Sequence, residues 1–475
     1  MALKLPNIVE ETLPTKTTTV LQLLAYDLPP IFQPPLDLSP ENVAETFDPP
    51  GSNTSDAIAI SQLPIPADSF RKRLSEFLKQ SEKGTYKSLH IPWSSLEVSR
   101  TGLWLIGYWD HIERLRWLQG EWRKIHLWLQ DCRNADTDIP GAHAIYDQAI
   151  TNVESLFYEQ ELYSFRGQLA SALHIASRLL SEQWVDSWTL SGIIDAFSAR
   201  QQSMKQNHRS KSYILPCHIL ASIEGAYHAS RQDNEKPFQV PKSSKPLKTW
   251  IDGGGETFFF VLNVNQNHWV AAKVNIPACC VQVGDSLRMF QGVHTALQPM
   301  LSWLSNLLNK GFTIKFGLVC GKQQDGISCG LFAANTIAFH VFSDGLLTHR
   351  RRELARASYF NELVVVHSQS VPNCLSLRNG PPHIIEPGIN GCSNKMRTTA
   401  LYTGSNASPG DAKLAQHHHP DTDPEVIDIS DSSSDSDGFE PGKDIKPLCE
   451  ELETDGNCNI VGSSYSEFVP ESAAT

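Results

Sequence analysis

One of the ten cysteines has a setting that suits nucleophilic catalysis. Cys329 stands between Ser328 and Gly330, at the start of a predicted helix and directly after the polar loop GKQQDG. A helix N-terminus presents unpaired backbone N–H groups and the positive end of the helix dipole, which favour the thiolate, the nucleophilic form of cysteine. The pattern therefore indicates a nucleophile, although a lone cysteine is more often a small buried hydrophobe.

Three further side chains can serve such a nucleophile. His268 stands where the turn NQN gives way to an apolar run, so we expect its imidazole at a strand end, facing a cleft as a general base. Asp285 follows the run VQVG, and a carboxylate there can hydrogen-bond the imidazole and hold its tautomer. Gln323, six residues before Cys329, supplies a neutral amide that can donate to an oxyanion. Spacing does not fix geometry, so the residues alone leave a Cys/His/Asp hydrolase as one interpretation among others.

The elements that must position these residues follow from hydrophobic periodicity and turn signals. In chain order the sequence predicts strands at 257–264, 269–276 and 279–283, a helix at 293–310, a strand at 313–320 and an apolar helix at 329–342. Strands in one block flanked by helices predict a domain of the α+β class.

Three motifs occur in order along this stretch: HW at His268, GDSL with its Asp seventeen residues after that His, and QQDGISCG with its Gln six residues before Cys329. Together they resemble the catalytic signature of the ubiquitin-like-protein-specific cysteine proteases, the Ulp/SENP or SUMO protease family. WTLSGIIDAF, from Trp188 to Phe197, is similar to the family's opening helix, and LLTHRRRELARASYF resembles its closing basic helix. The resemblance covers about residues 180–366 and implies a papain-like cysteine protease fold of the α+β class.

The resemblance implies a role for each matching catalytic residue. Cys329 would be the nucleophile, His268 the base, Asp285 the partner that orients the base, and Gln323 the donor of an oxyanion hole. The family usually has Asp directly before the Cys, whereas this chain has Ser328. A serine can still cap the helix but supplies no charge.

The resemblance also implies a substrate tunnel. Trp269 follows the His as in the family, where that indole covers the C-terminal Gly-Gly of the substrate, and Trp188 would form the opposite wall. A tunnel between two flat indoles admits only residues without a Cβ, which selects a di-glycine tail.

The function that follows is a thiol peptidase or isopeptidase that cleaves after the C-terminal Gly-Gly of SUMO or a related modifier, from conjugates or from precursors. Its partners would be the modifier and its conjugates, and it would need no cofactor. Nuclear residence is a further expectation from the family. The alternative, from another class, is a non-catalytic SUMO-binding scaffold that retains the protease fold.

The chain divides into four predicted parts. Residues 1–65 are a Pro-rich disordered arm, 66–180 a helical region of unknown function, 181–366 the protease domain and 367–475 a disordered acidic tail. The helical region holds five tryptophans, which are more typical of an amphipathic helix packing into a core than of a recognition surface. They are Trp104, Trp109, Trp117, Trp122 and Trp128.

The tail contains a second motif at 424–437, PEVIDISDSSSDSD. Val426, Ile427 and Ile429 surround Asp428 and precede further acids, so this run can add a strand to a sheet edge and aim its charges at a basic rim. It resembles a SUMO-interacting motif. The alternative is a solvated acidic tail that happens to include three aliphatic residues.

Composition excludes several other functions. Residues 421–475 hold 15 acids against Lys443 and Lys446 and so carry −13 of the net charge of −12, while the rest of the chain carries +1. No nucleic-acid footprint is therefore visible in the body. The longest apolar run, near Phe258, is too short to span a membrane, and the scattered cysteines indicate an intracellular protein. An esterase with Ser286 of GDSL as nucleophile lacks its other motifs, and His417–His419 lack partners for a metal site.

Overall fold

The computed structural model describes nine stretches of the chain, and the positions between and beyond them are left aside. The described residues are 4–32, 47–48, 57–80, 85–86, 88–90, 100–163, 169–204, 211–232 and 241–375. The predicted tail motif, with Val426, Ile427, Asp428 and Ile429, lies outside the described residues, so its interpretation stays a prediction.

A five-stranded mixed sheet forms the centre of the catalytic part of the molecule, in the order β12-β11-β10-β9-β8. β10 pairs antiparallel with β9 and with β11, while the edge strands β8 and β12 pair in parallel with β9 and β11, respectively. The strands are β8 (Ser212–Ile214), β9 (Thr257–Val264), β10 (His268–Asn275), β11 (Cys280–Gly284) and β12 (Thr313–Phe316). The predicted strands at 257–264, 269–276 and 279–283 are thus confirmed, and the strand predicted at 313–320 ends earlier, at Phe316.

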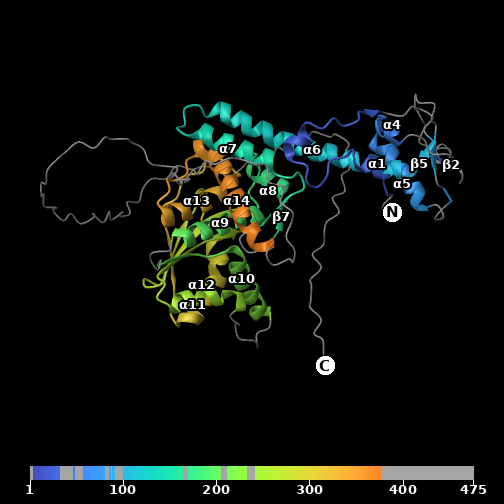
Figure 1. Cartoon of the computed structure of the whole chain (residues 1–475). Coiled ribbons are helices and arrows are strands. Elements are labelled where there is room, and N and C mark those ends of the chain that lie inside the picture. The colour runs from blue at the N-terminus through green and yellow to red at the C-terminus, as the bar shows by residue number, and fades with distance from the viewer. Residues whose placement is uncertain are drawn as a thin grey trace, which may run out of the picture. The chain divides into compact units, whose positions relative to one another are not determined.

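The alternation of side chains along β9 explains why helices cover both faces of this sheet. Successive residues of a strand point to opposite faces. Phe259 and Val261 join one buried apolar cluster, whereas Phe258, Phe260 and Leu262 join another. The second cluster is completed by α10 (Cys217–Gln232), α11 (Lys245–Asp252) and α12 (Val293–Leu308). Figure 1 shows these three helices on one side of the strands and α9 and α13 on the other.

The first cluster is built around α13 (Cys329–Phe342), the apolar helix predicted at 329–342. Its first ten residues, Cys329 to Ala338, are all buried, so the helix is buried on every side and not only along one stripe. α9 (Ser187–Met204) and α14 (Arg352–Leu375) pack against it. Because α13 also contacts β10, its N-terminus is placed beside that strand.

The helical region consists of α5 (Asp68–Gln80), α6 (Trp104–Ala135), α7 (Ala142–Ser155) and α8 (Ala172–Leu179). Trp109 and Trp122 are buried, and Trp104 and Trp128 pack partly buried against the same core, as the amphipathic interpretation predicted. Trp117 differs, because 59% of it is exposed.

The helical region shares its core with the catalytic part. α7 packs along α14, and the two lie side by side in Figure 1. The amide of Asn361 on α14 accepts a hydrogen bond from Asn152 of α7 at 2.8 Å and donates to the carbonyl of Ile145 at 3.0 Å. One apolar cluster runs from Val9 to Leu363 without a break at residue 180. The boundary predicted there does not coincide with a gap in packing.

The N-terminal segment differs from the predicted disordered arm. Residues 4–32 contain α1 (Asn7–Glu10) and α2 (Val20–Leu24), and Val9, Val20 and Leu23 are fully buried. Gln119 of α6 donates to the carbonyl of Leu23 at 2.8 Å. Only Pro6 and Pro14 precede residue 29 in the arm, and neither lies inside α1 or α2, so the aliphatic residues of these helices are free to pack.

The remaining elements of the described residues are short. They are β1 (Ile31–Phe32), β2 (Phe47–Asp48), α4 (Ala57–Ser61), β3 (Ile65–Pro66), β4 (Ser88–His90), β5 (Arg100–Gly102), β6 (Glu161–Tyr163), β7 (Leu169–Ser171) and the 3-10 turns η2 (Lys242–Ser244) and η3 (His349–Arg351). None of the helices seen in the described stretches combines the length and the apolar character that a bilayer crossing requires.

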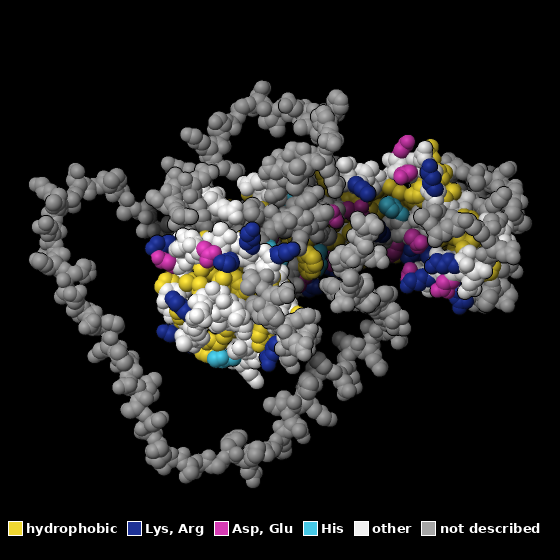
Figure 2. Space-filling model, turned by 90° about the horizontal axis from the view of Figure 1, so that it is seen from below, with side chains coloured by type: hydrophobic (Ala, Val, Ile, Leu, Met, Phe, Trp, Pro, Cys, Tyr) yellow, Lys and Arg dark blue, Asp and Glu magenta, His cyan; other side chains and the backbone are white. Residues whose placement is uncertain are grey.

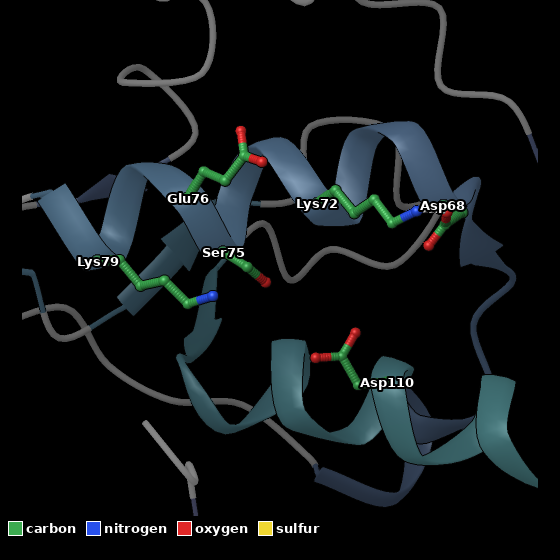
Figure 3. A pocket seen from close by; sticks show the side chains of 6 residues that line it. All are labelled: Asp68, Lys72, Ser75, Glu76, Lys79 and Asp110. Carbon is green, nitrogen blue, oxygen red and sulfur yellow. Dashed lines mark ion pairs between the residues drawn. The ribbon is translucent and has the colours of Figure 1, made fainter. Parts of the chain in front are cut away.

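One surface pocket, with a volume of about 280 Å³, lies between α5 and α6. Its lining residues are Asp68, Lys72, Ser75, Glu76, Lys79 and Asp110. Figure 3 shows five of them along α5 facing Asp110 of α6, and Lys72 pairs with Asp68 at 2.7 Å. On the face in Figure 2, Lys and Arg side chains likewise lie among acidic, hydrophobic and neutral ones. We interpret this mixed-charge pocket as solvated surface.

Candidate active site

The end of the sheet brings His268 and Asp285 together. Ala271 of β10 pairs with Gly284 of β11, so the beginning of β10 lies beside the end of β11. His268 is the first residue of β10, and Asp285 directly follows Gly284. Nε2 of His268 lies 2.8 Å from Oδ1 of Asp285, and both side chains are buried. The predicted contact is therefore present and follows from strand register.

Backbone N–H groups hold the Asp285 carboxylate. Leu287 donates to its Oδ1 at 2.9 Å, and Met289 and Phe290 donate to its Oδ2 at 2.8 and 3.1 Å. The chain turns tightly to bring them there, since Arg288 and Phe290 have φ values of 57° and 42°. Burial alone would raise the pKa of Asp285, but the hydrogen bonds from His268 and the backbone lower it to about 2. The carboxylate is thus ionised at neutral pH.

The thiol of Cys329 interacts with the same imidazole. Cys329 is the first residue of α13 and is 2% exposed. Since Nε2 of His268 is bound to Asp285, its other ring nitrogen is the one available to the thiol. Burial would lower the pKa of His268, but hydrogen bonds to Asp285 and Cys329 outweigh this effect and raise the pKa to about 9. An imidazolium that persists at neutral pH favours a neighbouring thiolate.

Gln323 is anchored on both sides of its amide. Its Oε1 accepts a hydrogen bond from the hydroxyl of Ser286 at 2.9 Å. Its Nε2 donates to the carbonyl oxygen and to Oδ1 of Asp325, at 2.6 and 3.1 Å. Ser286 follows β11, and Gln323 and Asp325 precede α13, so the amide is held by the two segments that also carry Asp285 and Cys329.

Asp325 is the residue of this loop that sequence reasoning missed. Its Oδ1 accepts hydrogen bonds from the backbone N–H groups of Ile327 and Ser328 at 2.9 and 2.8 Å. Burial would raise the pKa of Asp325, but these bonds and those from the Ser328 and Gln323 side chains hold it below its usual value. The Asp-Gly pair in a polar loop is the signal that indicates such an Asx turn.

Ser328 does not act as the cap that its type suggests. Its hydroxyl donates to Oδ2 of Asp325 at 2.9 Å, and no side-chain hydrogen bond caps α13. A negative charge therefore stands near the start of α13, on Asp325, four residues before Cys329. The family usually has this charge on the residue directly before the cysteine.

Trp269 lies against the turn that carries the thiol. A Cβ built on Gly330 would lie 3.5 Å from Cδ1 of the Trp269 indole and 3.3 Å from Cβ of Val185. The residue placed against Gly330 from the segment before α9 is thus Val185. Trp188, in the first turn of α9, is 52% exposed, and its role as the opposite wall stays a prediction.

α14 secures the segment that contains Val185. Arg356 is 2% exposed and donates to the carbonyls of Arg178 and Gln183, both at 2.9 Å. Burial lowers the pKa of this arginine to about 10, so it remains charged at neutral pH. Earlier in the same stretch, Nε of Arg352 lies 3.6 Å from Oδ2 of Asp325. The closing basic helix therefore contacts both sides of the site.

A buried thiol, imidazole and carboxylate linked in that order, at the junction of an apolar helix and an antiparallel sheet, can form and hydrolyse a thioester. Within the described stretches, no three His, Cys, Asp or Glu side chains gather as a metal site. The fold and the site define the class of protein as a cysteine protease.

A comparison with protein families gives a match to one type of cysteine protease. Residues 225–345 match the model of the Ulp1 protease family, C-terminal catalytic domain. The match contains Cys329, His268, Asp285, Gln323 and Trp269, so this stretch of the chain is similar to a Ulp1-type catalytic domain. The resemblance and the fold class deduced from the sequence are thereby confirmed.

No curated protein matches the chain. Solved structures match it at low sequence identity. The yeast Ulp1 protease domain in complex with Smt3, the yeast ortholog of SUMO, is 14% identical; the match covers 49% of this chain and 96% of that one, with a TM-score of 0.34. The Chaetomium thermophilum Ulp1-like SUMO protease catalytic domain is 16% identical, covers 52% and 88%, and has a TM-score of 0.31.

Proposed function

We propose that this cysteine protease cleaves after the C-terminal Gly-Gly of SUMO or a related ubiquitin-like modifier, either from conjugates or from precursors. The observation that carries the proposal is the linked row Cys329–His268–Asp285 with the Trp269 indole beside the turn that carries the thiol. A flat indole beside that turn favours substrate residues without a Cβ, and hence a di-glycine tail. The match to the Ulp1 protease family supports the same choice.

The first half of the proposed reaction forms a thioester. The Cys329 thiolate attacks the carbonyl carbon of the terminal glycine. The new oxyanion accepts a hydrogen bond from Gln323, one of whose amide N–H groups turns to it from Asp325. The His268 imidazolium then gives its proton to the leaving amine as the C–N bond breaks. Asp285 stays ionised and holds the imidazole by Nε2.

The second half releases the modifier. His268, now neutral, takes a proton from a water that attacks the thioester carbonyl. Cys329 leaves as a thiolate beside the restored imidazolium, and the modifier departs with a free C-terminal carboxylate. The same four side chains therefore serve both halves without a cofactor.

The test is covalent capture with modifiers that carry a C-terminal thiol-reactive group. We expect a SUMO probe to label the full-length protein and to fail with Cys329→Ser, while a ubiquitin probe labels weakly or not at all. Labelling by ubiquitin alone would contradict the modifier assigned but keep the protease. If neither probe labels a folded protein, the non-catalytic scaffold becomes the better description.

A further inference from the structure

Ser286 connects Asp285 with the loop that contains Gln323. Neither step of the proposed mechanism uses Ser286. It directly follows Asp285, the partner of His268, and is joined to Gln323 twice. The backbone N–H of Gln323 donates to the carbonyl of Ser286 at 3.1 Å, and the Ser286 hydroxyl donates to Oε1 of Gln323 at 2.9 Å. Ser286 and Gln323 are 5% and 4% exposed. Water therefore does not compete for these bonds.

These contacts fix which end of the Gln323 amide is the donor. The hydroxyl of Ser286 meets the amide oxygen, and the oxygens of Asp325 meet the amide nitrogen. A flipped amide would turn its oxygen toward the ionised carboxylate of Asp325, which has no proton to give. An oxyanion needs a donor, so only the observed orientation suits the reaction.

We propose that Ser286 is a positioning residue, which holds the Gln323 amide in the orientation that donates to the oxyanion. The inference rests on the proposed function, because it takes Gln323 as the oxyanion donor. It assigns adjacent residues of one turn to different tasks: Asp285 holds the base, and Ser286 holds the donor. The GDSL motif therefore contributes two supports and no nucleophile.

The central test is a double-mutant cycle in the full-length protein, with a SUMO derivative whose C-terminus carries a fluorogenic amine. Ser286→Ala should lower kcat about tenfold and leave KM unchanged, which is the effect of losing one buried neutral hydrogen bond. In a Gln323→Ala background the same change should lower kcat less than about twofold, because the side chain it acts through is gone. An equal loss in both backgrounds would overturn the inference.

A second readout separates Ser286 from the thiol and the base. Alkylation of Cys329 by iodoacetamide displaces iodide and creates no oxyanion, so Ser286→Ala should leave its rate unchanged, as followed by peptide mass spectrometry. A rate that falls with kcat would show that Ser286 acts through His268 or Asp285, against the proposal. Ser286→Thr keeps the hydroxyl and should restore most of kcat; failure to do so in a folded variant would also count against it.

The controls keep this result apart from the proposed function. Ser222→Ala removes an exposed hydroxyl that bonds only its own helix, to the carbonyl of His218 at 2.8 Å, and should match wild type in every readout. Thermal unfolding of each variant checks the fold. A wild-type protein that is alkylated normally but cleaves no modifier would overturn the proposed function and this inference with it. Normal cleavage with an unaffected Ser286→Ala variant would overturn this inference alone.

Discussion

The base half and the oxyanion half of this site are built by different means. His268 and Asp285 come from adjacent strands, and the pairing of Ala271 with Gly284 fixes their distance. Gln323 comes from a loop without regular structure, and side chains hold it in place. The first half depends on sheet register and backbone donors. The second depends on the identity of a few loop residues.

This difference predicts which substitutions each half tolerates. A backbone N–H is present whatever the side chain, so the turn around Asp285 keeps its donors when Leu287 or Met289 is replaced. The loop that contains Gln323 is more sensitive to substitution, because the groups that hold Gln323, the hydroxyl of Ser286 and the carboxylate of Asp325, belong to side chains. We therefore expect the base half to be sensitive at two positions and the oxyanion half at several.

The largest effect that tests the comparison belongs to the base half. Asp285→Asn should lower kcat about a thousandfold or more, since an amide in place of the carboxylate neither holds the right tautomer nor stabilises the imidazolium. The measurement is kcat with the fluorogenic modifier, and Cys329→Ala provides the zero of activity. An unaffected rate would show that another residue holds His268.

Gln323→Ala should have the next largest effect. Removal of one oxyanion donor costs about a hundredfold to a thousandfold in kcat, and KM should stay near wild type because the donor acts in the transition state. Gln323→Glu is the matched variant: it keeps the size of the side chain but brings no neutral amide donor. A variant with only KM altered would place Gln323 in substrate binding and not in the oxyanion hole.

The stability of the base half should depend on pH. The pKa of His268 is raised from 6.5 to about 9, so its contribution is complete below pH 6.5 and is lost as the pH rises through 9. The pKa of Asp285 is lowered from 3.8 to about 2, so its contribution is present above pH 3.8 and is lost as the pH falls through 2. The pair should therefore stabilise the fold most between about pH 4 and 6.5.

The measurement is chemical unfolding of the wild type and of His268→Gln between pH 6 and 9.5. The difference between them isolates this group from others that titrate in the same range. We expect the free energy of unfolding to fall by up to about 3 kcal/mol more in the wild type than in the variant over that pH range. Parallel curves would show that the protonated imidazole gains no stabilising partner on folding.

Asp325→Ala should test the oxyanion half as a stability element. The change leaves the N–H groups of Ile327 and Ser328 without their acceptor at the start of α13. Loss of an acceptor for two partly buried N–H groups costs about 1 to 3 kcal/mol of unfolding free energy. Asp325→Asn keeps an acceptor oxygen and should lose less. Equal losses of unfolding free energy in the two variants would indicate that the carboxylate is not the group that holds the loop.

Much of the base half could be predicted from the sequence, and the reason is physical. Strand periodicity locates His268 at the start of one strand and Asp285 after the end of the next. In an antiparallel pair the start of one strand lies beside the end of the other. The helix that begins at Cys329 follows from its apolar run. These features depend on local patterns, which a sequence displays directly.

The oxyanion half was predicted less completely because its bonds join residues far apart in the chain. Ser286 and Gln323 are 37 positions apart, and no period or turn signal relates them. Asp325 replaces a charge that the family usually has on the residue before Cys329, so matching the motif position by position missed it. The helix Cys217–Gln232 was also missed, although its apolar residues pack against α12.

The smallest expected effect concerns the link between the oxyanion half and α14. Nε of Arg352 lies 3.6 Å from Oδ2 of Asp325, while its Nη2 pairs more closely with Glu353, at 2.8 Å. Weak ion pairs with partial solvent access contribute about 0 to 1 kcal/mol, so Arg352→Gln should change kcat less than about threefold. A much larger fall would mean that α14 holds the catalytic loop. Since α14 also packs along α7, the helical region could then act on the oxyanion half and not on the base half.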